Sequence, residues 1–270
     1  MVLVPTVFQM LRLVVLVAAI LASARARAQS AEWTRESVEP IPSAPHITHE
    51  RQVWRERDSA DQTVVELVRI RPPEAGFRVI DQGSAGDQSL ADAMRGAGAL
   101  AGINGGYFHP DRQPLGLVVS NGVTVHSEER ARLLSGVLLV FANGSIRLQR
   151  VDEPRPKLIL REALQAGPFL VDNGEPVAGL DGKRTARRSV VATDGAGTWA
   201  ILTIDHATLA EAAALLAMPG VLGGDRKIER ALNLDGGSST GLWVKGPGGG
   251  TPHYTPEFGT VRNFLGVFAR

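Results

Sequence analysis

The chain has 270 residues, 44% of them hydrophobic, and contains no cysteine. The lack of cysteine excludes disulfide bonds, thiol catalysis and thiolate metal sites. Its 29 Lys and Arg residues are balanced by 28 Asp and Glu residues, so the chain has no overall basic field with which to bind nucleic acid. We therefore expect a globular protein without a nucleic-acid partner.

Residues 1–28 are typical of a secretory signal peptide. Arg12 precedes an apolar run over 13–22, which is too short to span a bilayer, and Ala-Arg-Ala at 26–28 is a small-x-small cleavage site. The alternative, an N-terminal membrane anchor, fits this short run less well. Removing the segment leaves a net charge of −2. We expect a periplasmic or secreted protein with no stable membrane span after signal removal.

Residues 29–50 are polar, contain Pro and Ser and show no periodicity, which predicts a linker or extended arm. His46 and His49 lie in this segment at a spacing that a metal pair could use, but a mobile arm is the simpler interpretation. The chain has no HExxH or HxH motif. We therefore assign no metal ligand and no cofactor, and we place the domain at 51–270.

The domain is predicted to consist mainly of antiparallel strands. Apolar, β-branched runs alternate with four Asn-Gly or Asp-Gly pairs, which favour hairpins because a type I′ turn needs positive φ at both central residues. Helical spacing occurs at 89–95 and, after a Thr-x-x-Glu capping box, at 208–217. The predicted fold is a single β-rich α+β domain with one or two packed helices. The four pairs are Asn121-Gly122, Asn143-Gly144, Asn173-Gly174 and Asp194-Gly195.

Two segments place a polar residue and two glycines at the end of a short apolar strand. They are Asn104-Gly105-Gly106 and Asp235-Gly236-Gly237. Each could be an ordinary turn, but glycine pairs also let backbone N–H groups approach a ligand closely. If the two strands are neighbours, the Asn104 and Asp235 side chains would converge on one cleft.

Two further positions carry charge near predicted strand ends. Arg188 begins a β-branched strand; such a residue is commonly a solvated flank, but it could also bind an anionic group through two hydrogen bonds. Asp205 and His206 precede the second helix and are either an acid/base pair or a helix lead-in. The chain has no GxSxG elbow and no P-loop, which argues against activated-serine and nucleotide chemistry.

Seven segments resemble, in order, those of the phosphodiester glycosidase family. NGG followed by an aromatic residue and Phe, with NLDGG later in the chain, is a specific combination, although each piece alone is weak. The similarity runs from about Ala99 to Arg270. The segments are INGGYF (103–108), PLGLVVSNG (114–122), AGPFLV (166–171), RRSVVATDG (187–195), TLAEAAALL (208–216), ALNLDGGSST (231–240) and RNFLGVF (262–268).

The resemblance implies a hydrolase that cleaves a sugar-1-phosphodiester at its glycosidic C–O bond, in a cell-envelope or extracellular glycan. It assigns catalytic roles to Asp235, Asn104 and Arg188. Asp235 would stabilise the oxocarbenium-like centre or activate water, Asn104 would orient substrate or water, and Arg188 would bind the phosphate. The expected substrate-binding residues are Gly105, Gly106, Tyr107, His109, Ser189, Gly236, Gly237, Ser238 and Asp205.

Two departures from the family pattern bear on the substrate-facing surface. Ser238 stands where the family often has a third glycine, and His206 stands where a glycine often follows the strand-end Asp. Two other function classes stay open. In a non-catalytic polysaccharide-binding protein of the envelope, Asp235 would only cap a turn. A metal-dependent phosphodiesterase would need a carboxylate and histidine cluster, which the spacing does not show.

Overall fold

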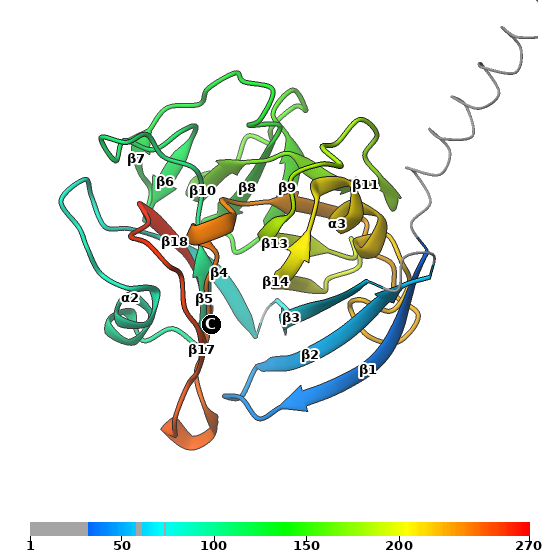
Figure 1. Ribbon diagram of the computed structural model, residues 1–270. Coiled ribbons are helices and arrows are strands. Elements are labelled where there is room, and N and C mark those ends of the chain that lie inside the picture. Colours follow the sequence, from blue (N-terminus) through cyan, green and yellow to red (C-terminus); the bar gives the residue numbers. More distant parts are fainter. Residues whose placement is uncertain (1–31, 58–60, 73) are drawn as a thin grey trace, which may run out of the picture.

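The computed structural model describes residues 32–57, 61–72 and 74–270 (Figure 1). The predicted signal peptide at 1–28 lies outside the described residues. These residues form three antiparallel sheets and two α-helices. The predicted β-rich α+β fold is confirmed.

The first sheet has eight strands in the order β1-β2-β3-β14-β13-β15-β11-β12, and the other two have five strands each, in the orders β7-β6-β10-β8-β9 and β17-β16-β5-β18-β4. The strands of the first sheet are β1 (Trp33–Ile41), β2 (Ile47–Glu56), β3 (Gln62–Ile70), β11 (Phe169–Asp172), β12 (Glu175–Pro176), β13 (Ala186–Thr193), β14 (Trp199–Ala207) and β15 (Arg230–Asn233). The second sheet contains β6 (Val118–Ser120), β7 (Val123–His126), β8 (Gly136–Phe141), β9 (Ile146–Arg150) and β10 (Leu160–Ala166). The third contains β4 (Ala75–Asp81), β5 (Ala101–Asn104), β16 (Leu242–Val244), β17 (His253–Thr255) and β18 (Asn263–Ala269).

All three sheets contribute to one central hydrophobic core. Ile201 of the first sheet, Leu138 of the second and Leu265 of the third belong to the same buried cluster. The outer faces of two sheets are covered by helices, which lie on opposite sides of the molecule in Figure 1. Helix α3 (Leu209–Leu216) packs on the first sheet, and α2 (Leu90–Ala97) packs on the third.

Both helices begin where the sequence predicts. The Ser89 side chain accepts a hydrogen bond from the backbone N–H of Asp92 and caps α2. Thr208 and Glu211 form the expected capping box at the start of α3, so two orphan backbone donors find acceptors there. The predicted helices at 89–95 and 208–217 are therefore confirmed.

The four predicted hairpins are present, but their turns differ. Asn121-Gly122 has φ of 49° and 79°, and Asn173-Gly174 has 53° and 79°, as a type I′ turn requires. At Asn143-Gly144 and Asp194-Gly195 only the glycine has positive φ, so these turns are not type I′. The dipeptide therefore predicts the hairpin correctly, while longer-range pairing decides the turn type.

The segment expected as a linker or arm at 29–50 differs from that expectation in its described part. It contains β1 and the beginning of β2, which pair antiparallel along their length. Seven consecutive residues of β1 inside the strand are exposed, so the strand carries no hydrophobic alternation that its sequence could show. The strand forms because β2 offers its hydrogen-bonding edge.

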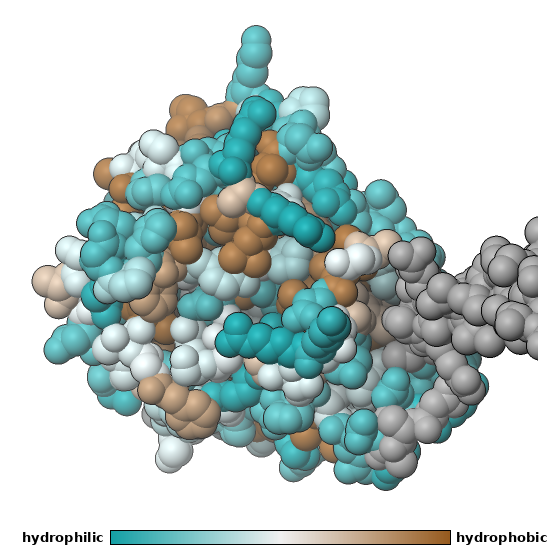
Figure 2. Space-filling view, turned by 45° about the horizontal axis from the view of Figure 1, so that its top comes forward, coloured by the Kyte–Doolittle hydropathy of each residue, from teal (hydrophilic) through white to brown (hydrophobic). Residues whose placement is uncertain are grey.

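No helix among the described residues is long and apolar enough to cross a membrane. On the face seen in Figure 2, the hydrophobic areas are separated by hydrophilic side chains.

Candidate active site

Asn104 and Asp235 meet although their strands belong to different sheets. Asn104 ends β5 in the third sheet, and Asp235 follows β15 in the first. The Asn104 Nδ2 group donates to the Asp235 carbonyl oxygen at 2.6 Å, and the Asp235 N–H donates to the Gly105 carbonyl at 3.1 Å. The two strand ends therefore meet through packing between two sheets and not as neighbouring strands, and the contact joins the Asn104 side chain to the Asp235 backbone.

Asn104 is the centre of a buried polar junction. Its side chain is fully buried, and its Oδ1 atom accepts hydrogen bonds from Ser189 Oγ at 2.6 Å and from the Gly241 N–H at 3.3 Å. The Ser189 hydroxyl also lies 3.2 Å from Thr240 Oγ1. Because both ends of the Asn104 amide already have partners, Asn104 positions its neighbours and has little capacity left for a ligand.

The glycines after Asn104 serve packing. Their N–H groups donate to Asn263, Gly105 to its carbonyl at 2.8 Å and Gly106 to its Oδ1 at 2.9 Å. A Cβ on Gly105 would lie 2.0 Å from the same Oδ1 atom. These two N–H groups are therefore occupied in this structure, in contrast to the expectation that they face a ligand. Asn263 was missed because nothing near it in the sequence indicates this pairing.

The second glycine pair has a more open environment. Gly236 donates its N–H to Oδ1 of Asp235 at 2.9 Å, and Gly237 adopts φ of 65°. The N–H groups of Gly237 and Ser238 have no hydrogen-bond acceptor among the described residues. Ser238 is exposed, and Gly236 and Gly237 are partly exposed. This turn therefore offers backbone donors beside the Asp235 carboxyl group.

The Asp235 carboxyl group is largely buried, and burial raises its pKa above the ordinary value. Hydrogen bonds from Ser239 and from the Gly236 N–H act in the opposite direction, because they favour the ionised form. A raised carboxyl pKa moves the group closer to the range in which a general base is most effective. The local environment thus suits Asp235 to proton transfer.

Tyr107 lies close enough to Asp235 to respond to its charge. Burial, and secondly the Asp235 carboxylate, raise the pKa of the Tyr107 phenol. The hydroxyl donates to the Gly167 carbonyl at 2.7 Å and accepts from Asn233 Nδ2 at 2.9 Å. Tyr107 therefore stays protonated and fixed, and Asn233 is a positioning residue that the sequence analysis did not select.

Arg188 is buried, with 8% of its surface exposed. Its Nε group donates to the Ala207 carbonyl at 2.9 Å, and Nη2 donates to the Arg184 carbonyl at 2.6 Å. Burial lowers its pKa, and the nearby Tyr107 partly opposes this shift. Within the described ranges Arg188 forms no salt bridge and its Nη1 group has no hydrogen-bond acceptor, although the charges of Asp181 and Glu211 act to raise its pKa. A buried guanidinium that is held by carbonyls and has no directly bonded carboxylate is suited to binding an anion.

Two predicted binding residues do not take part in the hydrogen bonds of this junction. His109 is exposed in a turn, where its backbone pairs with Gln113 and Arg112. Asp205 is exposed near the end of β14 and directly follows Ile204, the partner of Arg188, but no hydrogen bond among the described residues joins it to Ser189 or Asp235. The structure therefore joins Asn104, Ser189 and Asp235 by hydrogen bonds that do not include His109 or Asp205.

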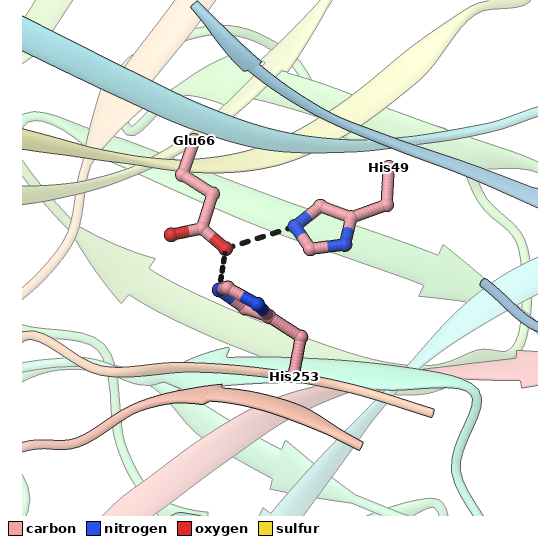
Figure 3. Close-up of side chains that lie close together, drawn as sticks. All are labelled: His49, Glu66 and His253. Atoms are coloured by element: carbon pink, nitrogen blue, oxygen red, sulfur yellow. Dashed lines mark hydrogen bonds and ion pairs between the residues drawn. The ribbon is translucent and has the colours of Figure 1, made fainter. Parts of the chain in front are cut away.

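A second polar cluster lies between the same two sheets (Figure 3). His49 of β2, Glu66 of β3 and His253 of β17 each offer one atom that could hold a metal ion, and these atoms lie within 4.8 Å of one another. Burial acts to raise the pKa of Glu66, but hydrogen bonds from His253 and His49 lower it to about 2. Because His49 lies in β2, it belongs to a strand and not to a mobile arm.

The sequence does contain one signal of this cluster. Glu66 interrupts the apolar run VVELV, and a carboxylate in a buried strand needs a partner. The partner histidines come from positions 17 residues before and 187 residues after it, so local spacing could not identify them. The spacing of the sequence does not show this carboxylate and histidine cluster, which is visible only in the structure.

A cavity of about 570 Å³ lies elsewhere on the first sheet. Its lining includes Ile70, which pairs with Trp199 of β14. Ser189 of the junction pairs with Thr203, which lies four positions further along the same strand. At about 3.3 Å per residue, this separation is roughly 13 Å along the strand. The cavity is therefore distinct from the junction at Asn104.

The fold and the junction define a strand-rich domain with a carboxyl group and a buried arginine at the meeting point of two sheets. The chain belongs to the phosphodiester glycosidase family, whose model matches residues 97–268. The predicted resemblance is confirmed, and the chain is placed among hydrolases that act on phosphodiester-linked sugars. No curated protein sequence matches the chain.

Two solved structures share the fold. The catalytic domain of zebrafish N-acetylglucosamine-1-phosphodiester alpha-N-acetylglucosaminidase, auto-inhibited by its pro-peptide, has a TM-score of 0.67 at 15% identity over 87% of this chain and 89% of that chain. A Burkholderia pseudomallei protein, provisionally named an exported protein, has a TM-score of 0.51 at 16% identity over 77% of this chain and 74% of its own. At these identities the likeness concerns the fold.

Proposed function

We propose that this protein is an exported hydrolase that cleaves a sugar-1-phosphodiester of a cell-envelope or extracellular glycan. Water adds to the anomeric carbon, the C–O bond to the phosphate breaks, and the products are the free sugar and a phosphomonoester. Export is supported by the signal-like segment at 1–28 and by the name of the Burkholderia pseudomallei protein of similar fold.

The observation that supports this proposal best is the arrangement at the junction of the two sheets. The Asp235 carboxyl group, with its raised pKa, lies close to Tyr107, which in turn lies close to Arg188. A phosphomonoester is a much weaker base than a sugar alkoxide, so its departure depends less on a general acid and more on charge stabilisation. One carboxylate and one arginine that forms no salt bridge match that requirement.

Each residue of the junction has a separate role in the proposed reaction. Asp235 activates the water or stabilises the oxocarbenium-like centre, and Arg188 binds the phosphate through its unused Nη1 group. The N–H groups of Gly237 and Ser238 provide further donors to the developing anion. Asn104 and Ser189 hold the Asp235 backbone in place and do not contact the reacting atoms.

The decisive experiment incubates the purified protein with a panel of α- and β-linked sugar-1-phosphate methyl diesters and measures the reducing sugar released. Asp235→Asn is expected to lower kcat by about 10³-fold, the range of a lost general base. Asp87→Asn, an exposed carboxylate in a loop, is the matched control and should retain full activity. Wild-type turnover that survives in Asp235→Asn would refute the catalytic role.

The panel also separates catalysis from simple binding. If the wild-type protein binds the diesters in calorimetry but releases no sugar, the protein is a polysaccharide-binding protein and the proposal is wrong. Release of sugar-1-phosphate and methanol, or of free sugar whose anomeric oxygen does not come from ¹⁸O-labelled water, would show cleavage of a P–O bond instead.

Arg188 provides a test of substrate class. Arg188→Lys keeps a positive charge but loses the guanidinium geometry, whereas Arg188→Ala removes both. We expect kcat/KM for phosphodiesters to fall about 100-fold or more in Arg188→Ala, comparable to the loss of a donor that stabilises a developing anion. Activity or binding toward neutral glycosides should change little. An equal loss on both substrate classes would show that Arg188 acts by holding the Ala207 and Arg184 carbonyls.

A further inference from the structure

Three residues from two sheets direct their metal-binding atoms at one point. His49 Nε2 lies 2.8 Å from Glu66 Oε1, and His253 Nε2 lies 2.6 Å from the same oxygen. The other carboxylate oxygen, Oε2, accepts a hydrogen bond from Thr255 Oγ1 at 3.1 Å. Figure 3 shows His253 approaching Glu66 from the side opposite the first sheet. The Thr255 bond therefore orients the carboxylate with Oε1 toward both imidazoles.

This set of donors is that of a transition-metal site. Two imidazole nitrogens and one carboxylate oxygen are the protein ligands of many zinc sites that keep a further position for water. With metal–ligand bonds of about 2.0–2.1 Å, tetrahedral ligand atoms are about 3.3 Å apart. The two nitrogens would need to withdraw from Oε1 by roughly half an ångström, which side-chain rotation supplies.

The three candidate ligands differ in their exposure to solvent. The His49 side chain has no exposed surface, and its Nδ1 atom has no hydrogen-bond partner among the described residues. A metal ion bound at Nε2 uses the lone pair of that atom, so the proton of the ring would then stand on Nδ1. His253, 39% exposed, leaves a route from solvent to the cluster.

The cluster is separate from the proposed active site but on the same face of the first sheet. Glu66 pairs with Thr203, and Thr203 pairs with Ser189, so the three residues form one row across β3, β14 and β13. At about 4.8 Å per strand, Glu66 lies roughly 10 Å from Ser189. Neither histidine nor Glu66 forms a hydrogen bond with Asn104 or Asp235 among the described residues.

We propose that His49, Glu66 and His253 form a binding site for a zinc-type divalent cation, completed by water. The ion would join β2 and β3 of the first sheet to the β16–β17 hairpin of the third, because His253 is the first residue of β17 and pairs with Val244 of β16. The site rests on geometry independent of the proposed hydrolase activity.

The experiment titrates tag-free, chelator-treated protein with Zn²⁺ in a calorimeter and with Co²⁺ in an absorption spectrometer. We expect one Zn²⁺ per chain and the visible bands of tetrahedral or five-coordinate Co²⁺. His253→Ala, a partly exposed position, and Glu66→Gln, which preserves the shape, should each weaken binding more than about 100-fold, since loss even of outer-shell partners costs about 10–100-fold. His46→Ala removes the neighbouring exposed histidine and is the matched control.

Several outcomes would overturn the proposal. These are no Zn²⁺ binding by the wild-type protein, affinity unchanged in both His253→Ala and Glu66→Gln, or a loss in His46→Ala as large as in the cluster variants. Circular dichroism of each variant verifies that it is folded. Because these readouts do not involve turnover, an inactive hydrolase with an intact metal site and an active hydrolase without one give different results.

Discussion

The two Gly-Gly segments look alike in sequence and differ in what they do. Gly105 and Gly106 are buried against Asn263, with both N–H groups occupied. Gly236 and Gly237 are partly exposed, and Gly237 has open space where a Cβ would stand. The first pair allows the close approach of Asn263, from β18 of the same sheet, and of Gln165, from β10 of the second sheet, whereas the second leaves backbone donors accessible beside the Asp235 carboxyl group.

This difference shows that a glycine pair after a buried strand has two distinct uses. One is steric, because the absent Cβ allows another backbone or side chain to come near. The other is conformational, because glycine adopts positive φ without strain. Only the second use leaves the N–H groups free. Variants of each turn can test whether the first glycine pair has the steric use and the second the conformational one.

The largest effect is expected for Asn104→Asp. The substitution replaces the Nδ2 donor by a carboxylate oxygen that faces the Asp235 carbonyl, at a fully buried position. An uncompensated buried charge costs about 3–5 kcal/mol, so the free energy of unfolding should fall by this amount. Urea denaturation measures it. Asn143→Asp, in an exposed hairpin turn, is the control and should be nearly neutral.

Gly105→Ala is expected to destabilise the protein by about 3 kcal/mol. The new Cβ would stand 2.0 Å from Asn263 Oδ1 and 2.9 Å from its carbonyl oxygen, and overpacking of this kind costs about 1–3 kcal/mol and occasionally more. The same denaturation series measures the change. A stable Gly105→Ala protein would mean that the close approach to Asn263 is not required.

Gly237→Ala is expected to be milder, at about 1–2 kcal/mol. Nothing lies within 4 Å of the added Cβ, so the cost comes only from φ of 65°. Activity should decline more than stability predicts if the neighbouring N–H groups bind the substrate anion. Full activity per folded molecule would argue that this turn, like the other, has only a structural role.

The smallest effect concerns pH. Ser239 donates a hydrogen bond that lowers the pKa of Asp235, against the larger effect of burial, which raises it. Removing that bond in Ser239→Ala should raise the pKa further and move the acidic limb of kcat/KM to higher pH, because the ionised form is the active base. The pH dependence of turnover measures the shift. An acidic limb that stays in place would mean that another group controls it.

The Asp235 carboxyl group should also make the free energy of unfolding depend on pH. Since the folded pKa of Asp235 lies above that of the unfolded chain, the unfolded state releases its proton first as pH rises. Asp235 therefore lowers the free energy of unfolding as pH increases from the unfolded pKa through the folded one. In Asp235→Asn this contribution should vanish, which acid denaturation curves of the two proteins can show.

Several parts of the fold and site were predictable from local sequence. The four hairpins follow Asn-Gly and Asp-Gly pairs, and α3 follows its capping box. β1 was not predictable, because its exposed residues carry no alternation and only pairing with β2 defines it. The motifs around Asn104 and Asp235 could also be predicted, because the strand, the polar residue and the two glycines follow one another in the chain, as the residues of each hairpin turn do.

The sequence by itself determined the strand-rich character, the turns and the family, because these depend on neighbouring residues and on motifs in a fixed order. Only the tertiary structure decided that Asn104 holds the Asp235 backbone, that Asn263 occupies Gly105 and Gly106, and that His49 and His253 meet at Glu66. Each of these contacts joins residues of different strands or their ends, and two of them, Asn104 with Asp235 and His253 with Glu66, join different sheets. Their partners lie from 17 to 187 positions apart, where packing and not local preference sets the distance.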